Sequence, residues 1–129
     1  MADNRPSDWD WVTAADECQA VKMFVRLRQL AQRDVATRNE QLSRLSFALT
    51  EVSGTEFYVS KDAGQNDRVS FKVADDLATI SVRNRTGETI YSVELDGAGV
   101  CKFSSGDQLF DFWQVLTAAL GSLMFLGRR

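Results

Sequence analysis

The sequence predicts an α+β fold made of a long N-terminal helix, a four- to five-stranded antiparallel meander and a C-terminal helix. Three observations predict it. Apolar residues recur every three or four positions over residues 21–52, at alternate positions in runs over residues 57–95, and at most positions of residues 112–126. Because a sheet with one apolar face needs a layer to cover it, we expect both helices to pack on the same face of the sheet.

The N-terminal helix is predicted from an apolar stripe at heptad-like spacing. The stripe consists of Val21, Phe24, Ala31, Val35, Leu42, Leu45, Leu49 and Val52, with Arg28 and Arg38 filling two gaps. Thr13 with Asp16 three residues later resembles a capping box, so the helix is expected to begin at about Ala14. Gly54 follows the stripe, at a position where helices commonly end.

Two interpretations of residues 14–53 compete. The stripe is weakest around Thr37, and Thr37 with Glu40 forms a second capping box, where a helical hairpin could break. No Gly or Pro, the residues that usually mark a break, lies in this stretch. We therefore favour one continuous helix to Ser53 over a hairpin that breaks near Thr37.

The sheet is predicted from four runs in which apolar and polar residues alternate, as a half-buried antiparallel sheet requires. The apolar positions of the runs are Phe57 and Val59, then Val69, Phe71 and Val73, then Ala78, Ile80 and Val82, and finally Thr89, Tyr91, Val93 and Leu95. Short connections rich in Asp, Asn and Gly separate the runs, which predicts successive hairpins. Val100 to Phe103 is expected to add a short fifth strand.

The C-terminal helix is predicted from a third capping box, Ser105 with Gln108, and runs to about Leu126. From Phe112 onward it is uncharged over 15 residues, whereas a membrane span needs about 20. We therefore expect a helix buried against the sheet and no membrane association. The core is expected to include Leu45, Leu49 and Trp113.

The composition excludes several classes of site. A length of 129 residues fits one domain, and the chain has no histidine. Ser-His-Asp and Cys-His nucleophile systems and histidine-containing zinc sites are therefore absent. The two cysteines are too few for a four-thiolate zinc site. We predict no catalytic, cofactor-binding or metal site, and we expect a protein that is not an enzyme.

A basic stretch over residues 22–44 is the strongest indication of a nucleic-acid contact. Lys22, Arg26 and Arg33 are spaced by four and seven, close to one helical face. Phosphate binding depends on such clusters. However, the net charge of the chain is −3 and no aromatic stacking platform is interleaved with the basic residues. We therefore favour a solvated or ion-paired face.

Residues 1–12 are predicted to form an acidic tail, followed by a single α+β domain over residues 13–129. The tail contains Trp9 and Trp11, flanked by aspartates. Tryptophan is a preferred anchor in protein interfaces, so the tail is a candidate docking peptide. The alternative is that the indoles pack on their own domain.

The N-terminus carries no apolar segment of the kind found in secretory signals. The chain has only two cysteines, Cys18 and Cys101. From these two observations we expect a cytoplasmic protein in which both thiols are reduced.

The leading hypothesis for function is a non-enzymatic, adaptor- or chaperone-like protein-binding module. We expect a homodimer, because the stripe and the terminal helix offer more apolar surface than one sheet face can cover. The partner-binding candidates are Trp9, Trp11, Lys22, Arg26 and Arg33. The alternative is a nucleic-acid-associated regulator that uses the helix over residues 22–44. A third hypothesis is a small-ligand carrier or enzyme lined by Tyr58, Tyr91 and carboxylates.

Overall fold

The computed structural model describes residues 10–43, 46–61 and 64–125. Within these residues the elements are α1 (Trp11–Glu17), α2 (Ala20–Leu42), β1 (Phe47–Ser53), β2 (Glu56–Lys61), β3 (Gly64–Val73), β4 (Ile80–Asn84), β5 (Gly87–Leu95), β6 (Cys101–Ser105), β7 (Gln108–Phe110) and α3 (Phe112–Phe125). The α+β class is confirmed, and the described sheet has seven strands where four or five were predicted.

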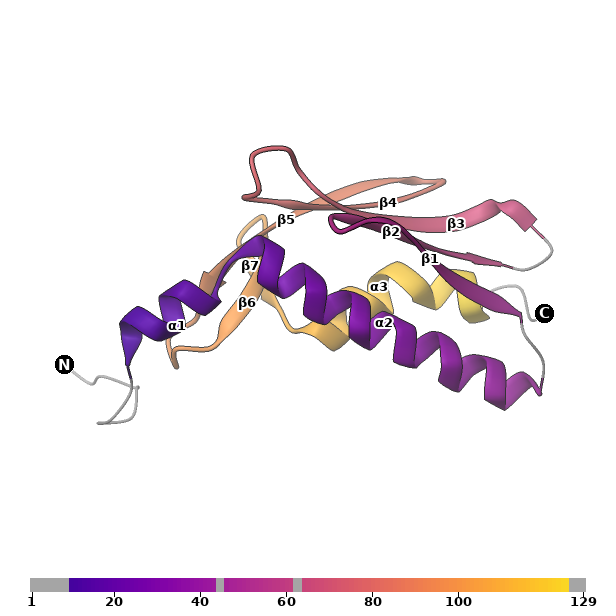
Figure 1. Ribbon diagram of the computed structural model, residues 1–129, viewed down its shortest axis with the longest axis horizontal. Coiled ribbons are helices and arrows are strands. Elements are labelled where there is room, and N and C mark those ends of the chain that lie inside the picture. The colour runs from indigo at the N-terminus through magenta and orange to yellow at the C-terminus, as the bar shows by residue number, and fades with distance from the viewer. Residues whose placement is uncertain (1–9, 44–45, 62–63, 126–129) are drawn as a thin grey trace.

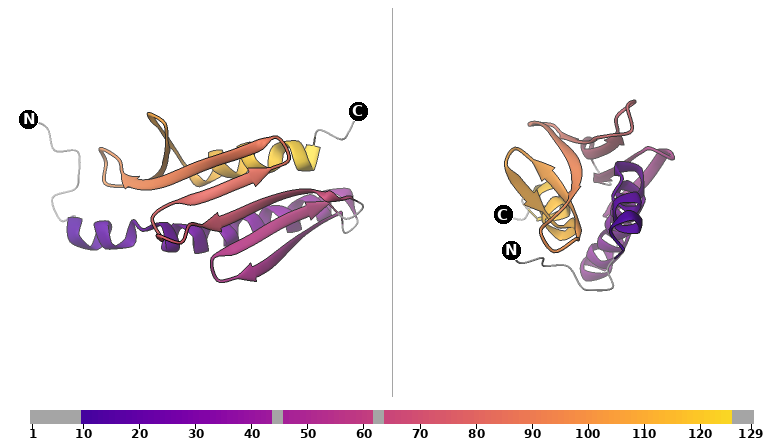
Figure 2. Two further views of the ribbon diagram at one scale, coloured as in Figure 1. Left: turned by 90° about the horizontal axis from the view of Figure 1, so that it is seen from above. Right: turned by 90° about the vertical axis from the view of Figure 1, so that its left-hand side faces the viewer.

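The sheet is one antiparallel meander, because each strand pairs with the next in the order β1-β2-β3-β4-β5-β6-β7. The long strand β5 pairs with β4 through residues 87–91 and with β6 through residues 92–95. Helices α2 and α3 lie side by side on one face of the sheet (Figures 1 and 2). Both helices contact the strands and each other, which confirms the predicted two-layer arrangement.

The core lies between the two layers, and phenylalanines are its largest fully buried side chains. The Phe57 and Phe71 rings stack with their centroids 4.5 Å apart, and Phe24 of α2 packs on Phe57 at 5.3 Å. Leu27 of α2 and Val115 of α3 are buried against them. The inward positions of β2 and β3 are those that the alternating pattern predicted. Burial of each such side chain stabilises the fold by about 1.5–3 kcal/mol.

The long helix does not reach Ser53, so both interpretations of residues 14–53 are wrong. Helix α2 ends at Leu42, and Ser43 adopts the left-handed conformation with φ of 57°. The Asn39 side chain then binds the chain beyond the helix. Its Oδ1 accepts from the backbone N–H groups of Ser46 and Phe47, and its Nδ2 donates to the Phe47 carbonyl, all at 2.9 Å. The helix thus ends without Gly or Pro, through a side-chain bridge.

The segment that follows, expected to be helical, forms β1. Leu49 is half-buried there, and Val52 is exposed. The strand pairs with β2, with Leu49 opposite Val59. An apolar spacing of two residues from Phe47 to Leu49 fits a strand as well as the longer spacing fits a helix, and pairing with β2 decides between them. Leu45, predicted in the core, lies outside the described residues.

The N-terminal end of the helix also differs from the prediction. Asp10 caps α1, since its carboxylate accepts from the backbone N–H groups of Val12 and Thr13 at 3.1 and 3.3 Å. The prediction that Thr13 and Asp16 cap the start of the helix is therefore wrong. Cys18 ends α1, and α2 starts again at Ala20. None of residues 11–17 is buried in the described structure, and α1 projects beyond the end of the sheet (Figure 1).

The prediction of two reduced thiols is wrong, because Cys18 and Cys101 form a disulfide. The bridge ties the junction of α1 and α2 to the start of β6. The two residues are 83 positions apart. Closing a loop of that length lowers the entropy of the unfolded chain enough to stabilise the fold by about 4–5 kcal/mol in the chain-entropy model.

The residues predicted to form the third capping box, Ser105 and Gln108, form a hairpin instead. Ser105 and Gln108 are paired across β6 and β7, and Gly106, at φ of 62°, opens the two-residue loop between them. Two-residue hairpin loops favour glycine at such positions because φ is positive there. Helix α3 begins only at Phe112. Trp113, predicted in the core, is 65% exposed, because α3 is apolar all round and the sheet covers only one side of it.

Candidate functional site: the groove between α2 and α3

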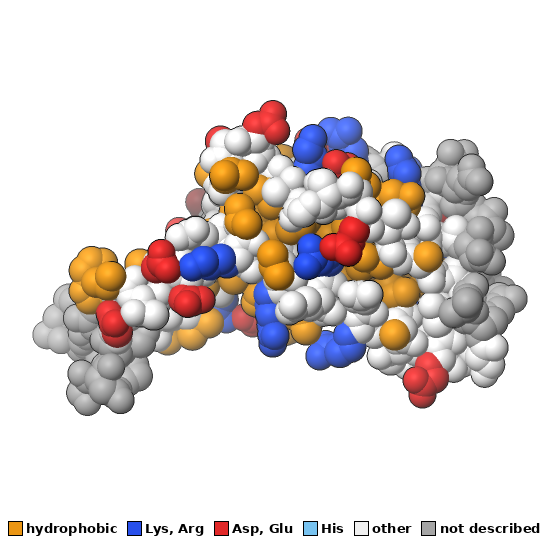
Figure 3. All heavy atoms as spheres, viewed as in Figure 1, with side chains coloured by type: hydrophobic (Ala, Val, Ile, Leu, Met, Phe, Trp, Pro, Cys, Tyr) orange, Lys and Arg blue, Asp and Glu red, His pale blue; other side chains and the backbone are white. Residues whose placement is uncertain are grey.

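The partner-binding candidates from the sequence do not come together in one place. Trp11 lies on the projecting helix α1 and is 58% exposed, whereas Trp9 lies outside the described residues. Hydrophobic side chains gather at the outer end of α1 (Figure 3). Lys22 pairs with Asp16 of α1 at 3.0 Å. Arg26 is exposed, and Arg33 lies further along α2, beside the groove described next.

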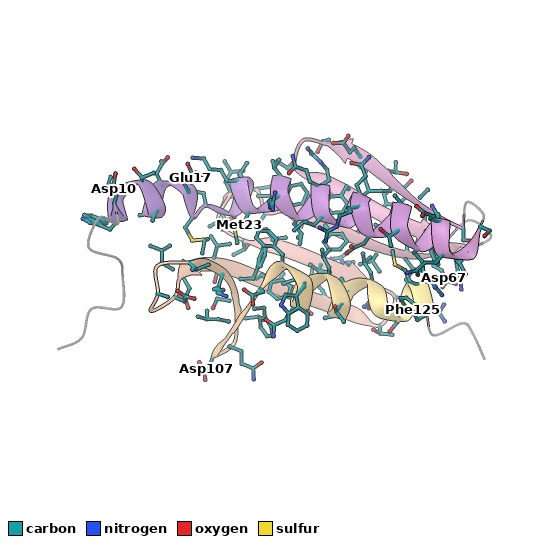
Figure 4. All side chains as sticks on the ribbon, turned by 90° about the horizontal axis from the view of Figure 1, so that it is seen from below. Asp10, Glu17, Met23, Asp67, Asp107 and Phe125 are labelled. Carbon is teal, nitrogen blue, oxygen red and sulfur yellow. A yellow bond between two sulfur atoms is a disulfide. The ribbon has the colours of Figure 1, made fainter. Side chains whose placement is uncertain are left out.

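Two adjoining hollows form a groove between α2 and α3, with volumes of about 270 and 500 Å³. They share Asp34, Leu116 and Thr117, so they are continuous. The helices run in the same direction, with Leu30 near Phe112 at one end of the groove. Figure 4 views this side of the molecule and shows α2 and α3 alongside each other.

One ridge of α3 forms a wall of this groove. It consists of Trp113, Thr117, Gly121 and Phe125, at a constant spacing of four residues that places them on one row of the helix surface. Phe125 is 47% exposed, and Trp113 is more so. A Cβ atom added at Gly121 meets no atom within 4 Å. The ridge is therefore high at both ends and low at its centre. Two exposed aromatic rings lie about 18 Å apart along the helix, with small residues between them.

Arg38 occupies the C-terminal end of the groove and is only 8% exposed. Its Nε donates to the Met124 carbonyl at 3.3 Å, and its Nη1 donates to Gln41 Oε1 at 3.2 Å. The guanidinium lies 4.0 Å from the centroid of the Phe125 ring. A cation is favourable here, because the carbonyl end of α3 carries partial negative charge.

One part of Arg38 is unsatisfied. Its Nη2 is buried and has no hydrogen-bond partner among the described residues. A buried donor without a partner costs about 1–3 kcal/mol, more when it is charged. The guanidinium therefore has an unused donor beside the hollow that Phe125 and Met124 also line.

Asp111 occupies the opposite, N-terminal end of the groove. Its carboxylate binds the Lys102 ammonium, and its side chain remains half-exposed. The hydrogen bond to Asp111 raises the pKa of Lys102 above its ordinary value, and Asp96 assists by charge. The backbone N–H of Asp111 donates to Gln114 Oε1 at 2.8 Å, which closes the first turn of α3. The groove thus has Arg38 at one end and, at the other, the Asp111 carboxylate together with the Arg33–Asp34 pair.

The basic stretch of α2 is largely compensated within the chain. Arg28 pairs with Glu51 of β1 at 2.9 Å, and Arg33 pairs with Asp34 at 3.7 Å. With Lys22 paired and Arg38 buried, few of its charges remain to release counterions from a phosphate backbone. In Figure 3 some basic side chains over α2 lie beside acidic ones, whereas others have no acidic neighbour in view.

The two tyrosines of the third hypothesis lie on opposite sides of the sheet. Tyr58 faces outward, where Arg68 lies 4.6 Å over its ring. Tyr91 is buried in the core against Phe103, and this burial raises the pKa of its hydroxyl. The structure therefore provides no single pocket lined by both tyrosines within the residues it describes.

No known protein family matches this chain, and no curated protein or solved structure shows a significant match to it.

Within residues 10–43, 46–61 and 64–125, no helix is both long enough and apolar enough to cross a membrane. Nor do three or more His, Cys, Asp or Glu side chains gather there as ligands for a metal ion.

Sequence reasoning missed the residues that define the groove. Arg38 was assigned to a gap in the apolar stripe, and Trp113 to the core. The usable signal was the spacing of four from Trp113 to Phe125 in a helix that is apolar on every side, since one sheet cannot bury all sides of a helix.

Proposed function

We propose that this chain is a non-enzymatic protein-binding module that forms a homodimer through the α2–α3 groove. The observation that carries the proposal is the exposure of Trp113 and Phe125 beside an apolar floor that includes Leu116 and Leu120. Exposed aromatic residues around a well-packed hollow are the usual anchors of protein interfaces. Exposed aromatic surface beside such a hollow is one mark of a protein–protein interaction site.

A second copy is the occupant that suits the groove. A two-fold dimer buries the same surface on both subunits, so that surface must complement itself. The groove meets this condition in charge, with Arg38 near one end and Asp111 near the other. It also meets it in shape, because the large and small residues of the α3 ridge are arranged symmetrically.

The adaptor- or chaperone-like role belongs to this proposal as well. A dimer that uses the groove leaves α1 free, and α1 exposes Trp11 and Val12. We assign partner binding to this helix, in keeping with the candidate role of Trp11. Nucleic acid is the less favoured partner, because Lys22, Arg28 and Arg33 of α2 are engaged in ion pairs.

The expected cytoplasmic location remains a prediction, and the Cys18–Cys101 disulfide weighs against it. Disulfides persist mainly in oxidising compartments and are rare where glutathione and thioredoxin keep thiols reduced.

The experiment is light scattering on the full chain across a dilution series. We expect the mass of a dimer that dissociates on dilution. Trp113→Ser should shift the equilibrium toward the monomer, because it removes the most exposed anchor. Trp11→Ser is the matched control, since Trp11 is similarly exposed but lies on α1, and it should leave the dimer intact. A wild-type monomer at every concentration would contradict the proposal.

A further inference from the structure

We infer that two copies of this chain pair through antiparallel α3 helices, about a two-fold axis between Thr117 and Gly121, so that Arg38 of each copy meets Asp111 of the other. The inference rests on the proposed homodimer and names its interface. It follows from three features of the groove: the shape of the α3 ridge, the unused donor of Arg38, and the position of Asp111.

The shape of the ridge is unchanged when its direction is reversed. Trp113, Thr117, Gly121 and Phe125 form the series large, small, small, large. In an antiparallel pair, Trp113 lies beside the partner's Phe125, and Thr117 lies beside the partner's Gly121. The aromatic rings then pack at both ends, while the small residues allow close approach of the two axes at the centre.

Packing within one subunit does not explain why position 121 is a glycine. Glycine is among the least favourable residues in the middle of a helix. A Cβ atom at this position would meet nothing within 4 Å, so packing inside the subunit does not require its absence. Close approach of a helix from a second copy would explain why this position is glycine.

The electrostatic argument is independent of the shape. Arg38 is more than nine-tenths buried and lines the hollow, and its Nη2 has no partner among the residues described. Asp111 lines the other hollow, and its carboxylate is half-exposed although it binds Lys102. Reversing the groove on itself places the partner's Asp111 at the end where Arg38 lies. A charge-assisted hydrogen bond to Nη2 is the interaction that the isolated subunit lacks.

Phe125 controls access to that donor, because its ring lies against the guanidinium. Side-chain rotamer changes at an interface are common on association, even where the backbone moves little. We assign to Phe125 a rotation toward the partner's Trp113, which opens Nη2 to the partner's carboxylate.

The decisive variant is Gly121→Leu, analysed by light scattering and thermal unfolding. A Cβ atom meets nothing within 4 Å here and Gly121 lines an open hollow, so we expect a melting temperature equal to or above that of the wild type. Leucine blocks the close approach of the two helices, so the dimer Kd should rise by at least about tenfold. Gln29→Leu, at an exposed position of α2 that lines neither hollow, is the control and should leave the Kd unchanged.

Charge exchange between copies tests the orientation. Arg38→Glu alone places like charges opposite each other in a homodimer, and so does Asp111→Lys alone. Mixing the two variants restores an opposite-charge pair at both ends. We expect each variant alone to be monomeric and the equimolar mixture to be dimeric.

The outcomes separate this inference from the proposed function. A wild-type monomer would overturn the homodimer itself. A dimer that Gly121→Leu does not weaken would overturn the antiparallel α3 pairing, and Trp113→Ser would then show whether the dimer still uses the groove. Loss of the dimer in Gly121→Leu without rescue in the mixture, with both charge variants folded, would overturn the Arg38–Asp111 contact. Gly121→Leu tests the interface even where a charge variant fails to fold.

Discussion

Asn39 binds both backbone polar groups of Phe47, through an N–H donated to its side-chain oxygen and a carbonyl that accepts from its side-chain nitrogen, each at 2.9 Å. This contact joins the last turns of α2 to the first residue of β1. It orients the chain so that Phe47 enters the core and β1 pairs with β2.

Asn39→Ala should therefore destabilise the protein by about 2–4 kcal/mol, because it removes three hydrogen bonds and leaves partly buried backbone groups without partners. Urea titrations of the free energy of unfolding provide the measurement. Gln32→Ala, at an exposed position of α2, is the control and should change stability by under about 0.5 kcal/mol. Equal effects of the two substitutions would show that Asn39 does not hold the junction.

The disulfide predicts a large dependence of stability on reductant. Reduction of Cys18–Cys101 should lower the free energy of unfolding by up to about 4–5 kcal/mol, since the unfolded chain regains the entropy of the long loop. The measurement is a urea titration with and without reductant, beside the Cys18→Ser/Cys101→Ser double variant, whose stability should not respond to reductant. Rapid labelling of both thiols in protein purified under oxidising conditions would contradict the bridge.

The position of Leu49 on the first strand lowers the effect expected of its truncation. Leu49 is half-buried on β1, which is at the edge of the described sheet, whereas Phe57 is fully buried on β2. Leu49→Ala should destabilise the protein by about 1–2 kcal/mol, and Phe57→Ala by about 3–5 kcal/mol. Urea titrations compare the two variants. A larger effect at Leu49 than at Phe57 would contradict this assignment of the core.

The lowered pKa of Asp96 accounts for part of the acid sensitivity that we expect of the fold. Its carboxylate accepts from the backbone N–H groups of Val100 and Ala98, and these bonds, with the charge of Lys102, lower its pKa. A lowered pKa in the folded state stabilises the protein above the ordinary value of about 3.9, and that stability is lost as the pH falls through the folded value.

Asp96→Asn keeps an acceptor but cannot titrate, so its stability should fall less steeply than that of the wild type below about pH 4. Urea midpoints measured from neutral to acid pH test this. The stability of the variant should still fall at acid pH, because Asp10 and Glu88 also have pKa values lowered by hydrogen bonds. Identical slopes in the two proteins would remove Asp96 as a contributor.

The parts of the fold that the sequence predicted are those set by local patterns. Strands β2 to β5 show a period of two that does not fit a helix, and their short Asp-, Asn- and Gly-rich turns leave only hairpins as connections. Residues 47–53 fit both periods, and they become a strand through a long-range pairing with β2 and the reach of Asn39. The disulfide joins residues 83 positions apart, so local sequence held no sign of it.

The candidate site was less predictable, for a related reason. Basic residues were visible in the sequence, but an ion-pair partner on another element, such as Glu51 of β1 for Arg28, was not. The exposure of Trp113 depends on which side of α3 the sheet covers. An apolar helix without a polar face does not specify that side, so the groove became evident only once the two helices were placed together.

The central claim is that Trp113 lies at an interface between two copies. A Trp9→Phe/Trp11→Phe variant keeps Trp113 as its one tryptophan, because the chain has three. Its fluorescence emission should lie at short wavelength in the concentrated dimer and shift to long wavelength on dilution, as the indole enters water. The midpoint of that shift should coincide with the dissociation seen by light scattering. Long-wavelength emission at every concentration, in a protein that stays folded, would contradict the account.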